Sequence, residues 1–121
     1  MTRRILIVDD EFGLAEVVAE MLGERGFATA LAINGQLALE RIREQSFDLV
    51  LMDCMMPILD GAGVMRALRA DPATANLPVI LMTALPHILA PDVEAAACAV
   101  LRKPFSPGEL FAAIDRCLQR G

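Results

Sequence analysis

The alternation of five short apolar segments with longer segments of helical spacing most constrains what this chain can fold into. The segment FDLVLMD is almost continuously apolar, which is typical of a strand covered on both faces of a parallel sheet. Strands that alternate with helices imply right-handed crossovers. The sequence therefore predicts an α/β fold, a doubly wound five-stranded parallel sheet with five helices on its two sides. The expected strands span 3–9, 27–33, 47–53, 77–84 and 98–103.

The first three helices are predicted from apolar spacing and from capping residues. Residues 11–26 have the spacing of an amphipathic helix, with Gly26 as its stop. Asn34 and Asp60 are suitable N-caps for the second and third helices, because their side-chain oxygens can accept hydrogen bonds from the free backbone amides of the first turn. We expect the first helix to bury one face that carries Leu14, Val17, Val18, Met21 and Leu22.

The last two helices are marked by proline and by a capping box. Pro91 disfavours helical geometry in the residue before it, so we expect a short fourth helix that begins at Pro91 and an extended loop over 85–90. The loop sequence LPHILAP is unusually apolar, and it either packs inward or forms part of a partner or dimer surface. The fifth helix is expected to begin with Ser106 and Glu109 in a capping box.

The composition suits one compact domain over residues 1–121. The chain is 55% hydrophobic and 22% charged, and its formal net charge is −5, which disfavours direct binding to nucleic acid. We find no signal peptide and no apolar segment of the length that a membrane span needs.

The three cysteines form no CxxC pair, which predicts buried, reduced thiols in a cytoplasmic protein. Disulfides and a structural metal are therefore not expected.

Charged and hydroxyl side chains stand where the expected strands end. The first strand ends at Asp9 and Asp10, the third at Asp53, the fourth at Thr83 and the fifth at Lys103. Because the carboxyl ends of parallel strands share one edge of the sheet, we expect these side chains to converge. Three neighbouring carboxylates require a cation, and an all-oxygen site with water suits Mg²⁺.

The same residues suggest a reaction. A carboxylate can attack phosphorus and form an aspartyl phosphate, and Asp53, alone at the end of the central strand, is the best candidate nucleophile. Asp9 and Asp10 are better placed as metal ligands, while Lys103 and Thr83 would take up charge on the phosphoryl oxygens.

In four motifs the chain resembles the receiver domains of two-component response regulators. The motifs are ILIVDDE, DLVLMDCMMPILDG, PVILMTA and LRKPF, in the family's order and over nearly the whole chain. The resemblance implies a flavodoxin-like sheet of order 2-1-3-4-5. It implies that Asp53 is the phosphoacceptor, with Thr83 and Lys103 beside the phosphoryl group. The implied Mg²⁺ site consists of Asp10 directly, Asp9 through water, Asp53 and the backbone carbonyl of Met55.

Two positions depart from the usual pattern of the family. Val100 stands where an aromatic ring often rotates inward on activation, so the usual coupling to Thr83 is in doubt and the 85–91 loop would be remodelled instead. Met55 and Leu85 flank the expected path of water to the phosphoryl group. Two apolar side chains there predict slow loss of the phosphoryl group.

We therefore expect a stand-alone receiver domain that takes a phosphoryl group from a histidine kinase or histidine phosphotransfer protein. It would signal to a downstream protein through the face of the fourth and fifth strands and helices, and it would catalyse only its own phosphorylation and slow autodephosphorylation. One alternative is a receiver-like interaction module that works without phosphorylation. A Mg²⁺-dependent phosphatase is disfavoured because the acids at 9 and 10 are adjacent and no cap insertion is present. The sequence also leaves open dimerisation and a fragment of a hybrid kinase or transcription regulator.

Overall fold

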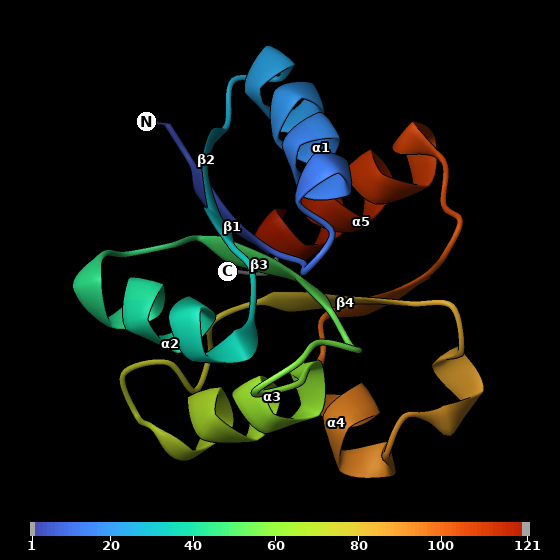
Figure 1. The fold of residues 1–121 in the computed structure, drawn as a ribbon. Helices are drawn as coiled ribbons and strands as arrows, with labels where there is room; N and C mark the ends of the chain where they lie inside the picture. Colours follow the sequence, from blue (N-terminus) through green and yellow to red (C-terminus); the bar gives the residue numbers. More distant parts are fainter. Residues whose placement is uncertain (1, 120–121) are drawn as a thin grey trace.

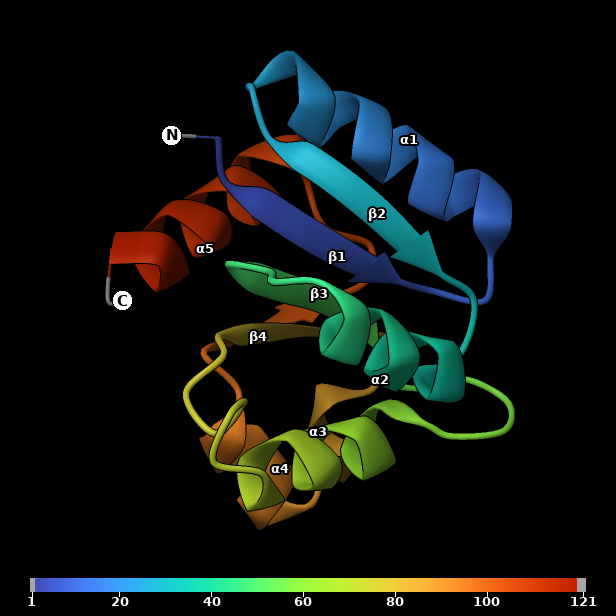
Figure 2. The same ribbon diagram turned by 90° about the vertical axis from the view of Figure 1, so that its left-hand side faces the viewer.

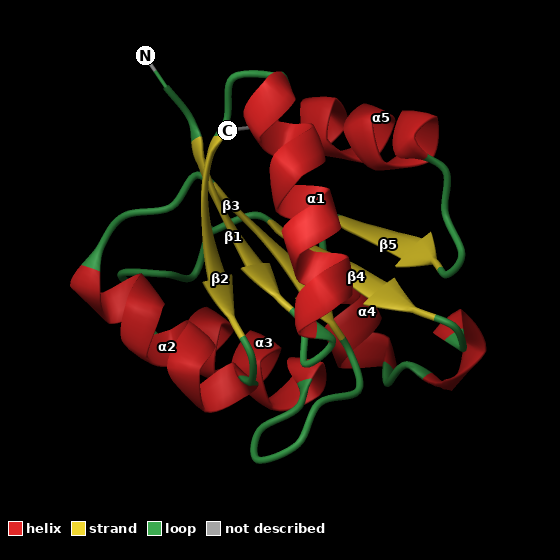
Figure 3. Cartoon of the chain, turned by 45° about the horizontal axis from the view of Figure 1, so that its top comes forward, coloured by secondary structure: helices red, strands yellow, loops and turns green. Residues whose placement is uncertain are grey.

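The computed structural model describes residues 2–119, which form one parallel sheet between two layers of helices. The predicted order is confirmed, since the strands lie in the order β2-β1-β3-β4-β5 and all pairs are parallel (Figure 3). The strands are β1 (Arg4–Val8), β2 (Ala28–Ala32), β3 (Leu49–Asp53), β4 (Val79–Thr83) and β5 (Ala99–Arg102). The helices are α1 (Phe12–Glu24), α2 (Gly35–Glu44), α3 (Gly61–Ala70), the 3₁₀ helix η1 (Pro86–Ile88), α4 (Pro91–Ala96) and α5 (Pro107–Gln119).

The two helical layers enclose two apolar cores that meet at the sheet. Helices α1 and α5 cover one face, and α2, α3 and α4 cover the other (Figures 1 and 2). Successive residues of a strand point to opposite faces, so both faces of β1, β3 and β4 are apolar and buried. The α1/α5 side receives Ile5, Ile7, Leu49, Leu51, Ile80 and Met82. The other side receives Leu6, Val8, Val50, Met52, Val79 and Leu81.

The predicted helix caps are confirmed. The side-chain oxygen of Asn34 accepts a hydrogen bond from the Leu37 amide at 2.8 Å, and that of Asp60 accepts one from the Gly63 amide at 2.9 Å. At α5, the Glu109 amide donates to Ser106 Oγ and the Ser106 amide donates to Glu109 Oε1, both at 3.1 Å. These bonds satisfy amides that the helices themselves leave free.

The predicted buried face of α1 is partly wrong. Val18 and Leu22 are buried, but Leu14 and Val17 are 40% and 52% exposed. The apolar stripe is wider than the surface that the sheet and α5 can cover. Its uncovered edge instead lines an apolar pocket of about 450 Å³ that Phe105 also borders.

The segment over 85–90 is not simply extended, because it forms the turn η1 before α4. Pro91 is the first residue of α4, as predicted. Only part of the segment packs inward. Leu89 packs against the core, whereas Leu85 and Ile88 are 46% and 58% exposed.

The prediction of three reduced thiols is also wrong. Cys98 and Cys117 form a disulfide with their Cα atoms 5.9 Å apart, while Cys54 keeps a free thiol. Cys98 directly precedes β5 and Cys117 lies in the last turns of α5. The packing of α5 against the sheet brings the two cysteines together.

No helix among residues 2–119 is long and apolar enough to cross a membrane.

Candidate functional site

The five predicted side chains meet at the carboxyl edge of the sheet. Asp53 and Thr83 are the last residues of β3 and β4, Asp9 and Asp10 follow β1, and Lys103 follows β5. Asp9, Asp53 and Thr83 are 2%, 8% and 3% exposed, so three polar side chains lie buried at the end of an apolar sheet. Such burial is costly unless the charges are compensated.

Lys103 supplies that compensation. Its Nζ lies 3.3 Å from Asp53 Oδ1 and 3.6 Å from Asp9 Oδ2. The strand register explains the placement, because Thr83 pairs with Arg102 and the Lys103 amide donates to the Thr83 carbonyl at 2.8 Å. The Lys103–Pro104 peptide bond is cis.

The loop after β3 fixes the backbone around Asp53. The Cys54 amide donates to the Met82 carbonyl, and the Gly61 amide donates to the Cys54 carbonyl, both at 3.0 Å. Gly61 is required here because a Cβ at this position would lie 2.9 Å from the Asp53 carbonyl oxygen. The same loop holds Met55, whose side chain is 66% exposed.

The electrostatics of the site are unbalanced toward negative charge. Burial raises the pKa of Asp53, Lys103 opposes that rise, and Asp9 and Asp10 add to it. Burial lowers the pKa of Lys103, but the attraction of Asp53 and Asp9 is stronger, so the net shift is upward. Cys54 is affected in turn, since burial and the Asp53 charge raise the pKa of its thiol to about 11. The three carboxylates outnumber the single ammonium of Lys103, so the site favours an added cation.

The donor set fits a hard divalent cation. One carboxylate oxygen each from Asp9, Asp10 and Asp53 lie within 4.8 Å of one another, and Asp10 is exposed, so the group is open to solvent. Oxygen ligands with room for water are what Mg²⁺ prefers.

The structure also reveals two features that the sequence did not indicate. Ile58, in the loop between β3 and α3, has a φ of 71° and is 80% exposed. A β-branched residue is rarely found in this left-handed region, so sequence pattern argues against such a conformation. The Thr83 Oγ1 accepts a hydrogen bond from the Leu85 amide at 3.0 Å, which ties the site to the segment that contains η1.

Comparison with known proteins agrees with this geometry. A family model described as the response regulator receiver domain matches residues 5–115. The DNA-binding response regulator MtrA of Mycolicibacterium paratuberculosis is 40% identical over 99% of this chain, which covers 53% of that protein. The chain thus spans about half the length of this curated relative.

Two similar crystal structures contain magnesium. The response regulator TrrA of Thermotoga maritima, in complex with Mg²⁺ and BeF, is 32% identical with a TM-score of 0.87, over 96% of this chain and 99% of that one. The receiver domain of the sensor histidine kinase PA1611 of Pseudomonas aeruginosa has a magnesium ion coordinated in its active-site cleft. It is 30% identical with a TM-score of 0.87, over 98% of this chain and 99% of that one. The fold, the acidic cluster and these similarities together show that this chain belongs to the response regulator receiver domain family of two-component signalling.

Proposed function

We propose that Asp53 accepts a phosphoryl group from a phosphohistidine of a partner protein in a Mg²⁺-dependent reaction. An Asp53 carboxylate oxygen attacks phosphorus, the O–P bond forms, and the N–P bond breaks with its electron pair left on the imidazole nitrogen. The observation that carries the proposal is the position of Lys103 Nζ, 3.3 Å from Asp53 Oδ1, within a cluster of three carboxylates. A bound Mg²⁺ would neutralise phosphoryl oxygens, with Asp9, Asp10, Asp53 and the Met55 carbonyl as its proposed protein ligands.

Intact mass tests the proposal most directly. The chain is incubated with phosphoramidate and Mg²⁺, and we expect a gain of one phosphoryl group that EDTA abolishes. Asp53→Asn should remove the gain, whereas Asp115→Asn, which changes an exposed acid on α5, should keep it. If the unmodified chain gains no mass, the proposal fails and the phosphorylation-independent module is favoured. The valine at position 100 is the feature that favours that second function.

Thr83 is the proposed link between the site and the signalling face formed by the fourth and fifth strands and helices. If the Thr83 side chain rotates toward a phosphoryl oxygen so that its hydroxyl donates there, Oγ1 moves away from the Leu85 amide and the hydrogen bond between them is lost. The segment with η1 would then be free to move, without an aromatic ring at Val100. Phosphorylation should therefore speed exchange of the amides of Leu85, His87 and Ile88, and Thr83→Ala should show fast exchange there with or without the donor. Unchanged exchange on phosphorylation would contradict this link.

The phosphoryl group is expected to be long-lived. The side chains of Met55 and Leu85 are apolar and 66% and 46% exposed. The Leu85 side chain has no hydrogen-bonding atom and the Met55 thioether is only a weak acceptor, so neither orients an attacking water well. The double variant Met55→Asn, Leu85→Glu should shorten the lifetime of the phosphorylated form. A longer lifetime in the variant would contradict the expectation.

A partner protein is expected to cover apolar surface beside the site. The pocket between α1 and the start of α5 is lined by Leu14, Val17 and Phe105 and extends to Lys103. We propose that the histidine-containing donor protein docks here. Val17→Ser should slow transfer from the protein donor but leave phosphorylation by phosphoramidate unchanged. Equal slowing with both donors would indicate damage to the site instead.

The proposal assigns these roles to residues 1–121 and places them in the cytoplasm. DNA binding belongs to the name of the longer mycobacterial relative. The net charge of −5 argues against direct contact between this chain and nucleic acid. A downstream protein is therefore the expected receiver of the signal.

A further inference from the structure

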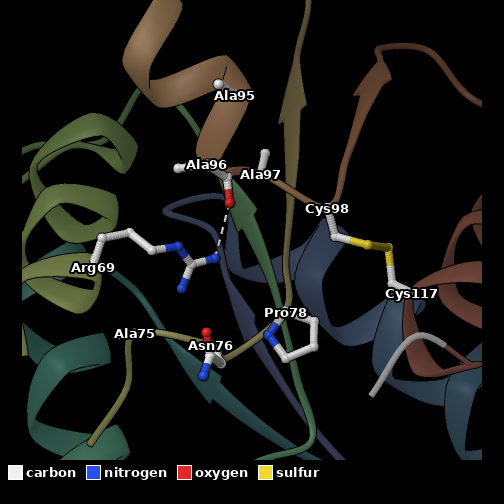
Figure 4. Close-up of a pocket in the computed structure, with 9 residues that line it drawn as sticks. All are labelled: Arg69, Ala75, Asn76, Pro78, Ala95, Ala96, Ala97, Cys98 and Cys117. Atoms are coloured by element: carbon white, nitrogen blue, oxygen red, sulfur yellow. Dashed lines mark hydrogen bonds between the residues drawn. A yellow bond between two sulfur atoms is a disulfide. The ribbon is translucent and has the colours of Figure 1, made fainter. Parts of the chain in front are cut away.

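The disulfide joins the edge strand of the sheet to the helix that covers it. Cys98 lies directly before β5, and Cys117 lies in α5 (Figure 4). Among residues 2–119, β5 pairs only with β4, so no strand holds its other side. The bond is therefore a covalent link between two elements that otherwise meet through side-chain packing.

A small molecule can approach the bond from outside. Cys98 and Cys117 line a pocket of about 380 Å³, together with Arg69, Pro78 and Ala96 (Figure 4). Cys98 is half-buried, whereas Cys117 is fully buried. Because Cys98 is the more exposed of the two residues, we expect a thiol in the pocket to reach its sulfur first.

The fold is compatible with both redox states. The Cys98 amide donates to the Val79 carbonyl at 2.8 Å, a backbone bond that does not involve the sulfur. Cys117 packs in the same core as Leu110 and Ile114. A reduced cysteine in such surroundings behaves as a small apolar side chain, so opening the bond leaves the core filled.

We propose that Cys98 and Cys117 form a reversible redox site that a small dithiol reduces in the folded protein. A thiolate of the reductant attacks Cys98 Sγ, the Sγ–Sγ bond breaks, and the Cys117 sulfur leaves with the electron pair and takes a proton. The second thiol of the reductant then attacks the mixed disulfide and releases Cys98. The protein gains two electrons and two protons, and the dithiol becomes a disulfide.

The position of the bond gives its reduction a structural consequence. The bond closes a segment that contains β5, Lys103 and the start of α5. Oxidation holds the beginning of β5 against α5, and Lys103 lies directly after the end of the same strand. Reduction should therefore loosen β5 and the end of α5, whether or not Asp53 is phosphorylated. In a cytoplasm kept reducing, a disulfide of this kind is usually transient and redox-sensing.

Thiol counting and amide exchange test the proposal in the unphosphorylated chain. After mild oxidation and denaturation, iodoacetamide should modify one cysteine, Cys54, and after reduction with dithiothreitol all three. Reduction should proceed without denaturant, at a rate that urea below the unfolding transition does not change. In the reduced form, amides of 99–102 and 115–119 should exchange about tenfold faster, which corresponds to about 1.4 kcal/mol of local opening.

Two variants serve as controls. Cys98→Ser should show the exchange of the reduced form even under oxidising conditions, and Cys98→Ala provides a second test if the serine variant does not fold. Cys54→Ser should keep the redox difference. Three modified cysteines after oxidation, reduction only in unfolding urea, or equal exchange in both redox states would overturn the proposal. None of these outcomes depends on phosphorylation, so failure here is distinct from failure of the proposed function.

Discussion

Replacing Lys103 by methionine tests how the acidic site is stabilised. Methionine keeps the approximate length of the side chain but removes the ammonium that lies 3.3 Å from Asp53 Oδ1 and 3.6 Å from Asp9 Oδ2. At an effective dielectric constant of about 20, each attraction is worth roughly 4–5 kcal/mol before the cost of desolvation. Loss of one partner of a buried pair typically costs about 3–5 kcal/mol. Because the Lys103 side chain is 22% exposed, water screens it in part, and we expect a loss of about 3 kcal/mol.

Urea unfolding at neutral pH without Mg²⁺ measures this loss. Arg66→Met is the matched control, since Arg66 and Asp92 form a closer pair at 3.0 Å, but their side chains are 56% and 63% exposed. Water screens such a pair strongly, so the control should lose much less stability than Lys103→Met. Mg²⁺ should restore stability to Lys103→Met and leave the deficit of Arg66→Met unchanged, because only the first variant leaves carboxylates at the cation site uncompensated.

The pH dependence of Lys103→Met has a defined sign. Burial already raises the pKa of Asp53 and Lys103 opposes that rise, so the variant should raise it further. A carboxyl whose pKa is higher in the folded state destabilises the protein when ionised, and this cost disappears as the pH falls through the folded pKa. The deficit relative to the unmodified chain should therefore shrink as the pH falls from neutral through the raised pKa of Asp53 toward the ordinary carboxyl value of 3.8. An unchanged deficit, or a loss no greater than that of Arg66→Met, would show that Lys103 does not stabilise the buried carboxylates.

Three further predictions concern the same edge of the sheet. Ile58→Gly should stabilise the protein by about 0.5–1 kcal/mol in urea unfolding. The left-handed conformation of a residue other than glycine costs about 1–2 kcal/mol, and the greater entropy of glycine in the unfolded chain offsets part of that gain. A destabilised variant would contradict this. Gly61→Ala should cost about 2 kcal/mol through its close contact with the Asp53 carbonyl, whereas Gly13→Ala, which meets no atom within 4 Å, should gain up to about 1 kcal/mol. With a thiol pKa of about 11, Cys54 should react with iodoacetamide roughly a hundredfold more slowly at about pH 8 than a free thiol in the metal-free protein, and an ordinary rate would contradict that pKa.

The position of the site was predictable because chain geometry determines it. Parallel strands must end at one edge, so residues that close four of the apolar segments had to converge there. The sequence could not show that Lys103 approaches Asp9 as well as Asp53. That contact depends on how β5 pairs with β4, and no pattern within either segment records the register.

Two sequence predictions were wrong, for the buried face of α1 and for the cysteines. Both depend on how one helix or strand is placed against another, which the pattern within a single segment does not contain. The apolar spacing of α1 gives the direction of its buried face, but Leu14 and Val17 lie beyond the surface that the sheet and α5 cover. The separation of 19 residues between Cys98 and Cys117 likewise gives no distance between their Cα atoms. The way in which α5 crosses the sheet determines that distance.

Costly features of this chain gather at one edge of an otherwise well-satisfied fold. Among residues 2–119, no buried side-chain nitrogen or oxygen lacks a hydrogen-bond partner. At the carboxyl edge, however, Asp53 is buried beside two other acids, Ile58 is held in a left-handed conformation, and Met55 is apolar and largely exposed. Unfavourable conformations persist where the surrounding structure over-determines them, and they cluster at functional sites. The cost at Asp53 falls if a cation joins the acids, and the cost of exposing Met55 falls if a partner covers the loop, so these two features suit a bound state better than the isolated chain.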